Sequence, residues 1–216
     1  MNPDINRRRL LATLAGVLVT TPSLAGSRLL ATPPQSAGPF YPLELPLDDD
    51  NDLTLVAGRD AVAAGRVTEL SGGVQDLDGR PIPDARIEIW QCDANGRYRH
   101  PGERGTALRD ENFQGYGHSV TDGAGRYRFR TIRPVPYPGR TPHIHMAVFA
   151  PHSTPLVTQL YVRGEPRNAA DFLFNRVPAE RRHLVQADFL AAELPDVELR
   201  ASFDLVLGGA DGTPAG

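Results

Sequence analysis

Two histidines one residue apart, His143 and His145, are the side chains in this sequence whose type and spacing best suit chemistry. The run His143–Phe149 is rich in β-compatible residues and lies between Pro142 and Pro151, so we expect a strand. Residues i and i+2 of a strand project from the same face about 6.5–7 Å apart, near enough for two imidazoles to bind one metal ion. Taken alone, the pair is equally compatible with a structural or surface role.

Other candidate residues occur in a fixed order around this pair: Tyr98, Tyr137, Arg140 and Gln159. Tyr137 lies in the motif Pro-x-Pro-Tyr-Pro, Arg140 begins Arg-x-Pro-His-x-His, and Gln159 lies in Thr-Gln-Leu-Tyr. Together with segments 32–42 and 78–91, this order resembles the intradiol ring-cleavage dioxygenases, particularly the protocatechuate 3,4-dioxygenase subunits. The resemblance covers roughly residues 32–207.

The resemblance implies one Fe(III) ion per chain, with four ligands: Tyr98, Tyr137, His143 and His145. In the family, the tyrosine matching Tyr137 is axial, leaves the metal when substrate binds and takes a catechol proton. His145 matches the other axial ligand. Two phenolates suit a trivalent ion because they cancel two of its charges, and the ion in turn lowers the pKa of each phenol from its usual value of about 10. A single tyrosine is more commonly a half-buried aromatic with a hydrogen-bonded hydroxyl.

The resemblance also implies the reaction: O2 opens the ring of a catechol-type substrate between its two hydroxyl-bearing carbons, and both oxygen atoms are incorporated. Arg140 matches a family arginine that lies over the substrate ring and stabilises developing negative charge. Gln159 matches a glutamine near the oxygen and substrate pocket. Only five residues separate Tyr137 from His143, and Gly139 stands where relatives carry a bulky aromatic residue. We therefore expect a more open pocket and assign the substrate only to the catechol class.

Composition and turn signals predict an all-β sandwich of mostly antiparallel strands. The 216 residues include 21 Gly and 20 Pro spread between short alternating runs, which favours a single turn-rich β domain. We expect a Pro-rich arm over residues 26–60, the dioxygenase domain over 61–208 and a flexible tail over 209–216. One short helix is expected between Val177 and Leu190. The other strands are expected near residues 66–74, 85–91, 126–132, 156–162 and 199–207.

The first 25 residues have the pattern of an export signal. Arg7-Arg8-Arg9 precedes a short apolar run over residues 10–19, and Ala25 ends a small-residue cleavage site. The paired arginines resemble the twin-arginine signal for export of folded proteins, with an ordinary secretory signal or an uncleaved anchor as alternatives. We therefore expect a periplasmic or extracellular protein with no membrane partner after processing. Cys92 is the only cysteine and excludes an intramolecular disulfide.

Two other classes of function compete with the dioxygenase interpretation. The hairpin at 78–91 also resembles transthyretin-like domains, which would make the chain a non-catalytic exported binding module. An Fe(II) extradiol enzyme would need a carboxylate beside the two histidines, and Glu165 is the nearest candidate. A net charge of −3 without a basic stripe argues against a nucleic-acid partner. The acidic run 48–52 is expected to be a solvated loop rather than a calcium site. The sequence leaves homo-oligomerisation open.

Overall fold

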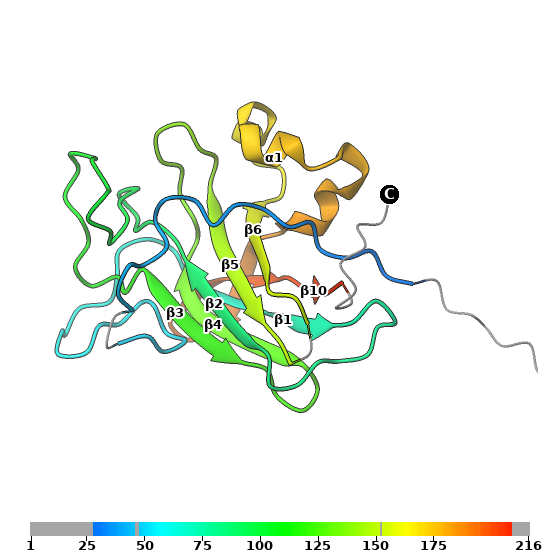
Figure 1. Cartoon of the computed structure of the whole chain (residues 1–216). Coiled ribbons are helices and arrows are strands. Elements are labelled where there is room, and N and C mark those ends of the chain that lie inside the picture. Colours follow the sequence, from blue (N-terminus) through cyan, green and yellow to red (C-terminus); the bar gives the residue numbers. More distant parts are fainter. Residues whose placement is uncertain (1–27, 46–47, 152, 209–216) are drawn as a thin grey trace, which may run out of the picture.

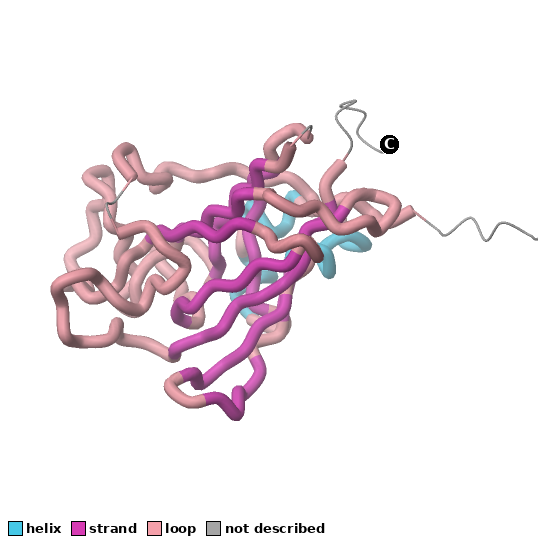
Figure 2. The backbone as a smooth tube through the Cα atoms, turned by 90° about the horizontal axis from the view of Figure 1, so that it is seen from below, coloured by secondary structure: helices cyan, strands magenta, loops and turns pink. Residues whose placement is uncertain are grey.

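The computed structural model describes residues 28–45, 48–151 and 153–208, which form two β-sheets with short helical segments beside them (Figure 1). The predicted signal peptide and the tail at 209–216 lie outside these residues. Within them, no helix is long and apolar enough to span a membrane. Figure 2 shows the helical segments gathered on one side of the strands.

The first sheet is built around the longest strand, β1. Its members are β1 (Val67–Gln75), β4 (Arg126–Ile132), β8 (Leu190–Leu194), β9 (Val197–Ser202) and β10 (Leu205–Val206). β1 pairs antiparallel with β4 and parallel with β9 and β10, while β8 pairs antiparallel with β9.

The second sheet has the strand order β3-β2-β5-β6-β7. Its members are β2 (Arg86–Trp90), β3 (Tyr116–Val120), β5 (His143–Phe149), β6 (Leu156–Val162) and β7 (Gln186–Ala187). Only the β6–β7 pair in this sheet is parallel. The predicted all-β sandwich of mostly antiparallel strands is therefore confirmed.

The main hydrophobic core lies between the sheets. Leu70 of β1 and Ile144 of β5 are both fully buried in it. In β4, Tyr127 and Phe129 point into the core while Arg128 is exposed, as the alternation in the sequence predicts. A shift of one residue in the strand pairing would turn the buried apolar side chains of a strand toward the outside. Burial of apolar residues from both sheets therefore fixes the register of each strand.

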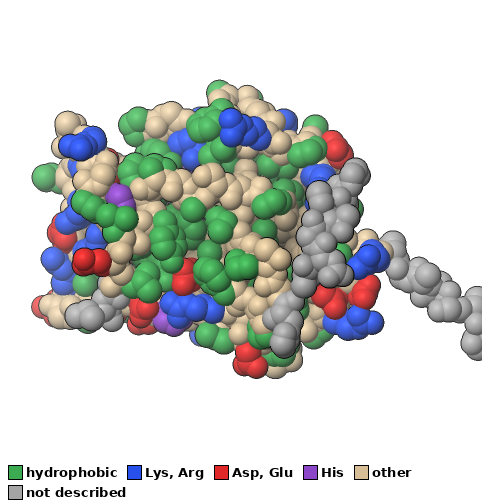
Figure 3. Space-filling model, in the orientation of Figure 1, with side chains coloured by type: hydrophobic (Ala, Val, Ile, Leu, Met, Phe, Trp, Pro, Cys, Tyr) green, Lys and Arg blue, Asp and Glu red, His purple; other side chains and the backbone are tan. Residues whose placement is uncertain are grey.

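The Pro-rich arm crosses the outer face of the second sheet, in front of β5 and β6 (Figure 1). It is held by backbone bonds from Thr32 N–H to the Val206 carbonyl at 2.9 Å and from Gln35 N–H to the Val157 carbonyl at 2.7 Å. Figure 3 shows apolar side chains gathered over the middle of this face. Because the arm covers it, β5 is buried on both faces except at its last residue. Water is therefore excluded from the outer face of β5 as well as from its core face.

The helical region differs from the sequence prediction. The α-helix α1 occupies Phe172–Arg176, preceded by the 3-10 helix η1 (Pro166–Ala170) and followed by the 3-10 helix η2 (Ala179–Val185). The prediction of one short helix in the C-terminal half is confirmed by α1, but its expected position over 177–190 is wrong. Asp171 caps α1 earlier in the chain, and Pro178 separates α1 from η2. β3, β7 and β8 were not predicted, and the expected last strand is divided into β9 and β10.

Acidic residues at 48–52 bond to the neighbouring strands. Asp52 accepts from Arg130 at 3.1 Å, and the backbone carbonyl of Asp49 lies 2.7 Å from Nδ1 of His118. Farther along the same segment, Leu53 is fully buried in the main core. The end of the arm therefore packs as part of the sandwich.

Candidate active site

The two histidines lie side by side on the outer face of β5. Each is 1% exposed, and their Nε2 atoms are 3.2 Å apart. Two nitrogens bound to one metal at about 2.1 Å and at right angles would lie about 3 Å apart. The strand thus presents two imidazole nitrogens at a separation that one metal ion can bridge.

Burial keeps both imidazoles neutral, which is the form that binds metals. It lowers the pKa of His143 to about 3, with a further contribution from the charge of Arg140, and it also lowers the pKa of His145 well below its usual value. Nδ1 of His143 lies 2.6 Å from the carbonyl of Thr141. Since a carbonyl only accepts, we assign the proton of His143 to Nδ1, so Nε2 carries a lone pair directed at His145.

Tyr98 reaches the histidines from the loop that follows β2. The buried carboxylate of Asp93 accepts from the backbone of Arg97 at 2.9 Å and turns the chain at Gly96. Gly96 has φ +73°, and a Cβ there would lie 3.1 Å from the carbonyl of Pro136. Glycine is therefore required on two grounds, the left-handed backbone and the close approach of the next loop. This contact brings the loop of Tyr98 against the loop of Tyr137.

Tyr137 begins a tight turn that ends at Arg140. The backbone N–H of Arg140 donates to the Tyr137 carbonyl at 2.9 Å, with Pro138 and Gly139 (φ +81°) at the central positions. Proline followed by a left-handed glycine is the pattern of a type II turn. The ring centroid of Tyr137 lies 5.3 Å from that of Tyr98 and 5.5 Å from that of His143.

The four predicted ligands therefore converge, and the environment of Tyr98 fits a cation. Its hydroxyl is buried and has no hydrogen-bond partner among the described residues, while burial raises its pKa well above the usual value. A buried polar group without a partner costs about 1–3 kcal/mol. A metal ion at this position would satisfy the oxygen and stabilise the phenolate.

Arg140 connects the predicted site residues to the helical region. Its Nε donates to Asp171 at 2.8 Å, its Nη1 to the Tyr137 hydroxyl at 3.3 Å and its Nη2 to Oε1 of Gln159 at 2.6 Å. Gln159 is fully buried on β6 and donates to the carbonyl of Ser36 in the arm at 2.9 Å. Both predicted non-ligand residues, Arg140 and Gln159, thus lie at the site.

Comparison with known proteins assigns the family. The dioxygenase family model matches residues 37–209. The chain is 38% identical to the protocatechuate 3,4-dioxygenase beta chain of Burkholderia cepacia, over 76% of this chain and 74% of that one. The chain belongs to the intradiol ring-cleavage dioxygenase family. This membership favours the catalytic interpretation over a binding module.

Two further relatives show how far the similarity extends. Hydroxyquinol 1,2-dioxygenase of Corynebacterium glutamicum is 35% identical over 60% of this chain, which spans about half (46%) of that protein. The dioxygenase domain of a dioxygenase carbohydrate-binding protein fusion from Streptomyces sp. SirexAA-E is 31% identical, with a TM-score of 0.65. The match covers 83% of this chain and 99% of that domain. The similarity thus extends over nearly the whole length of that dioxygenase domain.

The extradiol alternative is not supported by the geometry. Among the residues that the structure describes, no three His, Cys, Asp or Glu side chains form a group that could hold a metal. Glu165 instead caps η1 by accepting from the backbone of Arg167. The side chains that do converge are two phenols and two imidazoles.

Several residues that support the candidate site were not predicted from the sequence. Asp171 anchors Arg140, Phe40 stacks on Tyr98 at a centroid distance of 4.6 Å, and Trp90 stacks on His145 at 4.9 Å. Trp90 lies in the predicted strand at 85–91, but its position opposite His145 follows only from the pairing of β2 with β5. No local sequence signal marks Asp171 as a partner of Arg140.

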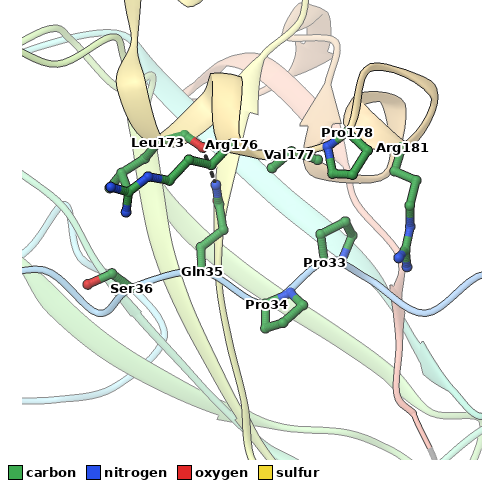
Figure 4. Close-up of a pocket in the computed structure, with 9 residues that line it drawn as sticks. All are labelled: Pro33, Pro34, Gln35, Ser36, Leu173, Arg176, Val177, Pro178 and Arg181. Atoms are coloured by element: carbon green, nitrogen blue, oxygen red, sulfur yellow. Dashed lines mark hydrogen bonds between the residues drawn. The ribbon is translucent and has the colours of Figure 1, made fainter. Parts of the chain in front are cut away.

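A cavity of about 360 Å³ is lined by Tyr98 and Phe40, and two further cavities border the site region; the histidines line none of the three. One, of about 500 Å³, is lined by the turn from Tyr137 to Arg140 and by Arg167. A Cβ at Gly139 would meet nothing within 4 Å, in keeping with the open loop that the sequence predicts. The other, of about 460 Å³, lies between the arm and the helical region, where Gln35 donates to the Leu173 carbonyl at 3.1 Å (Figure 4).

Asp171→Asn should destabilise the protein in a pH-dependent way. The side chains of Asp171 and Arg140 are 0% and 8% exposed. Burial alone would raise the pKa of Asp171, but hydrogen bonds from Arg140 and from the backbone of Phe174 and Thr141 lower it overall. At pH 7 we expect a loss of about 3–5 kcal/mol in the free energy of unfolding, as for a broken buried ion pair.

Because the folded-state pKa is lowered, this stabilisation is present above the unfolded pKa of about 3.9 and disappears as pH falls through the folded value. The difference between wild type and Asp171→Asn should therefore shrink below pH 4 in urea unfolding series. Asp188, in an exposed pair with Arg163 at 3.2 Å, provides the control. Asp188→Asn should change stability by about 0–1 kcal/mol. A pH-independent loss at Asp171 would contradict the assignment.

Proposed function

We propose that this chain is a non-haem Fe(III) dioxygenase with one ion per chain, held by Tyr98, Tyr137, His143 and His145. The observation that carries the proposal is the convergence of two neutral imidazoles and two phenols in a buried site, with the Tyr98 hydroxyl left without a partner. Bound there, ferric iron would supply the Lewis acidity that activates a catecholate toward O2.

Tyr137 is suited to take a proton from the substrate. Burial raises the pKa of its phenol, while the guanidinium of Arg140 acts in the opposite direction and stabilises the phenolate. When it is not bound to metal, the Tyr137 phenolate would lie 3.3 Å from Arg140 Nη1, and the positive charge of Arg140 would stabilise it. In that state it is available as a base. Arg140 also places a positive charge beside Tyr137, where it would stabilise negative charge that develops on a bound substrate, and Gln159 fixes the position of Nη2.

The loop after Tyr137 bears on which substituted catechols the site can accept. A cavity beside Tyr137 and Arg140 leaves room for ring substituents, and Gly139 contributes no side chain to close it. Substituted catechols should therefore be accepted alongside catechol. Relatives named for protocatechuate, hydroxyquinol and catechol all support a catechol-type diol as the shared feature.

Purified protein should contain about one iron per chain and absorb visible light through tyrosinate-to-Fe(III) charge transfer. With a panel of catechols it should consume O2 and release cis,cis-muconate-type diacids, identified by mass spectrometry. A muconic semialdehyde would mean cleavage outside the diol. Colourless protein that cannot be reconstituted with iron would overturn the ligand assignment.

The matched variants for this test are Tyr98→Phe and Tyr116→Phe. Tyr98→Phe removes one proposed phenolate and should remove much of the visible band. Tyr116 is also buried, at 2% exposure, but its hydroxyl bonds to Arg86 and lies outside the donor set. Tyr116→Phe should therefore keep the band.

Arg140→Ala should keep iron and colour while turnover falls by about 10²–10³, since a preorganised electrostatic group is lost. Arg140→Lys should recover only part, because an ammonium cannot reproduce the three-way hydrogen bonding of the guanidinium. Arg140→Ala also leaves Asp171 unpaired, so the double variant with Asp171→Asn is measured beside it. Loss of iron in the double variant, or unchanged turnover in Arg140→Ala, would contradict this role.

We further propose that residues 1–25 direct export through the twin-arginine route, on the basis of Arg7 and Arg8 before a short apolar run. Replacing both arginines with lysine should leave the precursor inside the cell, measured by fractionation and immunoblotting. Normal export of that variant would point to the general secretory route. Recovery of uncleaved protein in membranes would point to an anchor.

A further inference from the structure

The two histidines are oriented by different means. His143 is fixed by its Nδ1 contact with the Thr141 carbonyl at 2.6 Å. Nδ1 of His145 is buried and has no hydrogen-bond partner among the described residues. Metal-ligating histidines almost always use their second ring nitrogen in a hydrogen bond that sets the ring orientation. Something else must therefore hold the ring of His145.

Trp90 is the residue that contacts the face of this ring. Its indole lies parallel to the His145 imidazole, with centroids 4.9 Å apart and an interplanar angle of 4°. Both side chains are 1% exposed, and the two residues stand opposite each other in the β2–β5 pairing. Tyr41 packs edge-on against Trp90 at 5.0 Å and 88°, which limits movement of the indole itself.

The arm closes the other approach to the ring. Gly38 has φ +69°, and a Cβ at this position would lie 3.2 Å from Cε1 and 3.7 Å from Nε2 of His145. The absence of a side chain lets the backbone of the arm lie close to the imidazole. The His145 ring thus has a flat indole against one face and the arm backbone near its Cε1–Nε2 edge.

We propose that Trp90 is a positioning residue, which sets the rotation of the His145 ring so that Nε2 points at Nε2 of His143. Rotation of the imidazole about its Cβ–Cγ bond would break the parallel contact with the indole. Stacking therefore takes the place of the missing hydrogen bond at Nδ1. Where it concerns iron, the inference rests on the proposed function.

The test compares Trp90→Leu and Trp90→Phe with Tyr116→Leu. Tyr116 is opposite Trp90 in the β2–β3 pairing and is 2% exposed, so Tyr116→Leu makes a similar change in the same packing cluster. The structure records no ring contact between Tyr116 and His145. Iron affinity is measured by competition with a chelator, and the charge-transfer band by absorption spectroscopy.

Trp90→Leu should weaken iron binding by about 10–100-fold, as loss of an orienting group commonly does, and should shift the band. Trp90→Phe should recover part of the affinity because a phenyl ring can still stack. Tyr116→Leu should lower stability without this loss of affinity. Wild-type affinity and band in Trp90→Leu, or equal losses in Trp90→Leu and Tyr116→Leu, would overturn the proposal.

A readout without metal separates this inference from the proposed function. In crystal structures of the metal-free proteins, His145 should keep its Nε2 near 3.2 Å from that of His143 in wild type and should be rotated away in Trp90→Leu. An unchanged ring in Trp90→Leu would overturn the positioning role. If wild type binds no iron but the ring rotates as expected, the proposed function fails and the positioning role stands.

Discussion

The rest of the site depends on two imidazole nitrogens that are buried 3.2 Å apart. With the proton of His143 assigned to Nδ1, its Nε2 lone pair points at His145, and two such lone pairs repel unless a proton or a cation lies between them. In the metal-free chain, Nε2–H of His145 can fill this place. A metal ion can bind between the two Nε2 atoms only if that proton moves to Nδ1 of His145. Nδ1 has no hydrogen-bond partner among the described residues.

The layering around β5 excludes water from this pair of histidines. One face of the strand contributes Ile144 and Met146 to the main core, while the other carries the histidines beneath the arm. The arm therefore covers the candidate site in addition to packing against the sheet. Its Gly38 and the carbonyl of Ser36 contact the site, the latter through Gln159.

Period-two alternation predicted β5 and the inward facing of Tyr127 and Phe129 in β4, because alternation is a local property. The six candidate site residues followed instead from the resemblance of ordered motifs to a known family. The partners of those residues were not predictable in this way. Asp171 lies 31 positions from Arg140, and Trp90 meets His145 only through strand pairing. The helix was misplaced because apolar spacing at 184–190 also suits a 3-10 turn followed by a strand, and capping by Asp171 decided where the α-helix begins.

Asp171 also explains how a permanently charged arginine can serve a buried site. By accepting from Nε, it compensates the charge of Arg140 and leaves Nη1 and Nη2 to face Tyr137 and Gln159. The same carboxylate accepts from the backbone of Leu173 and Phe174, so the start of α1 fixes the plane of the guanidinium. A lysine ammonium could neutralise the charge of Asp171, but it lacks the planar guanidinium that donates to Asp171, Tyr137 and Gln159 at once. The helical region, remote in sequence from the histidines, is therefore the support that aims Arg140 at Tyr137.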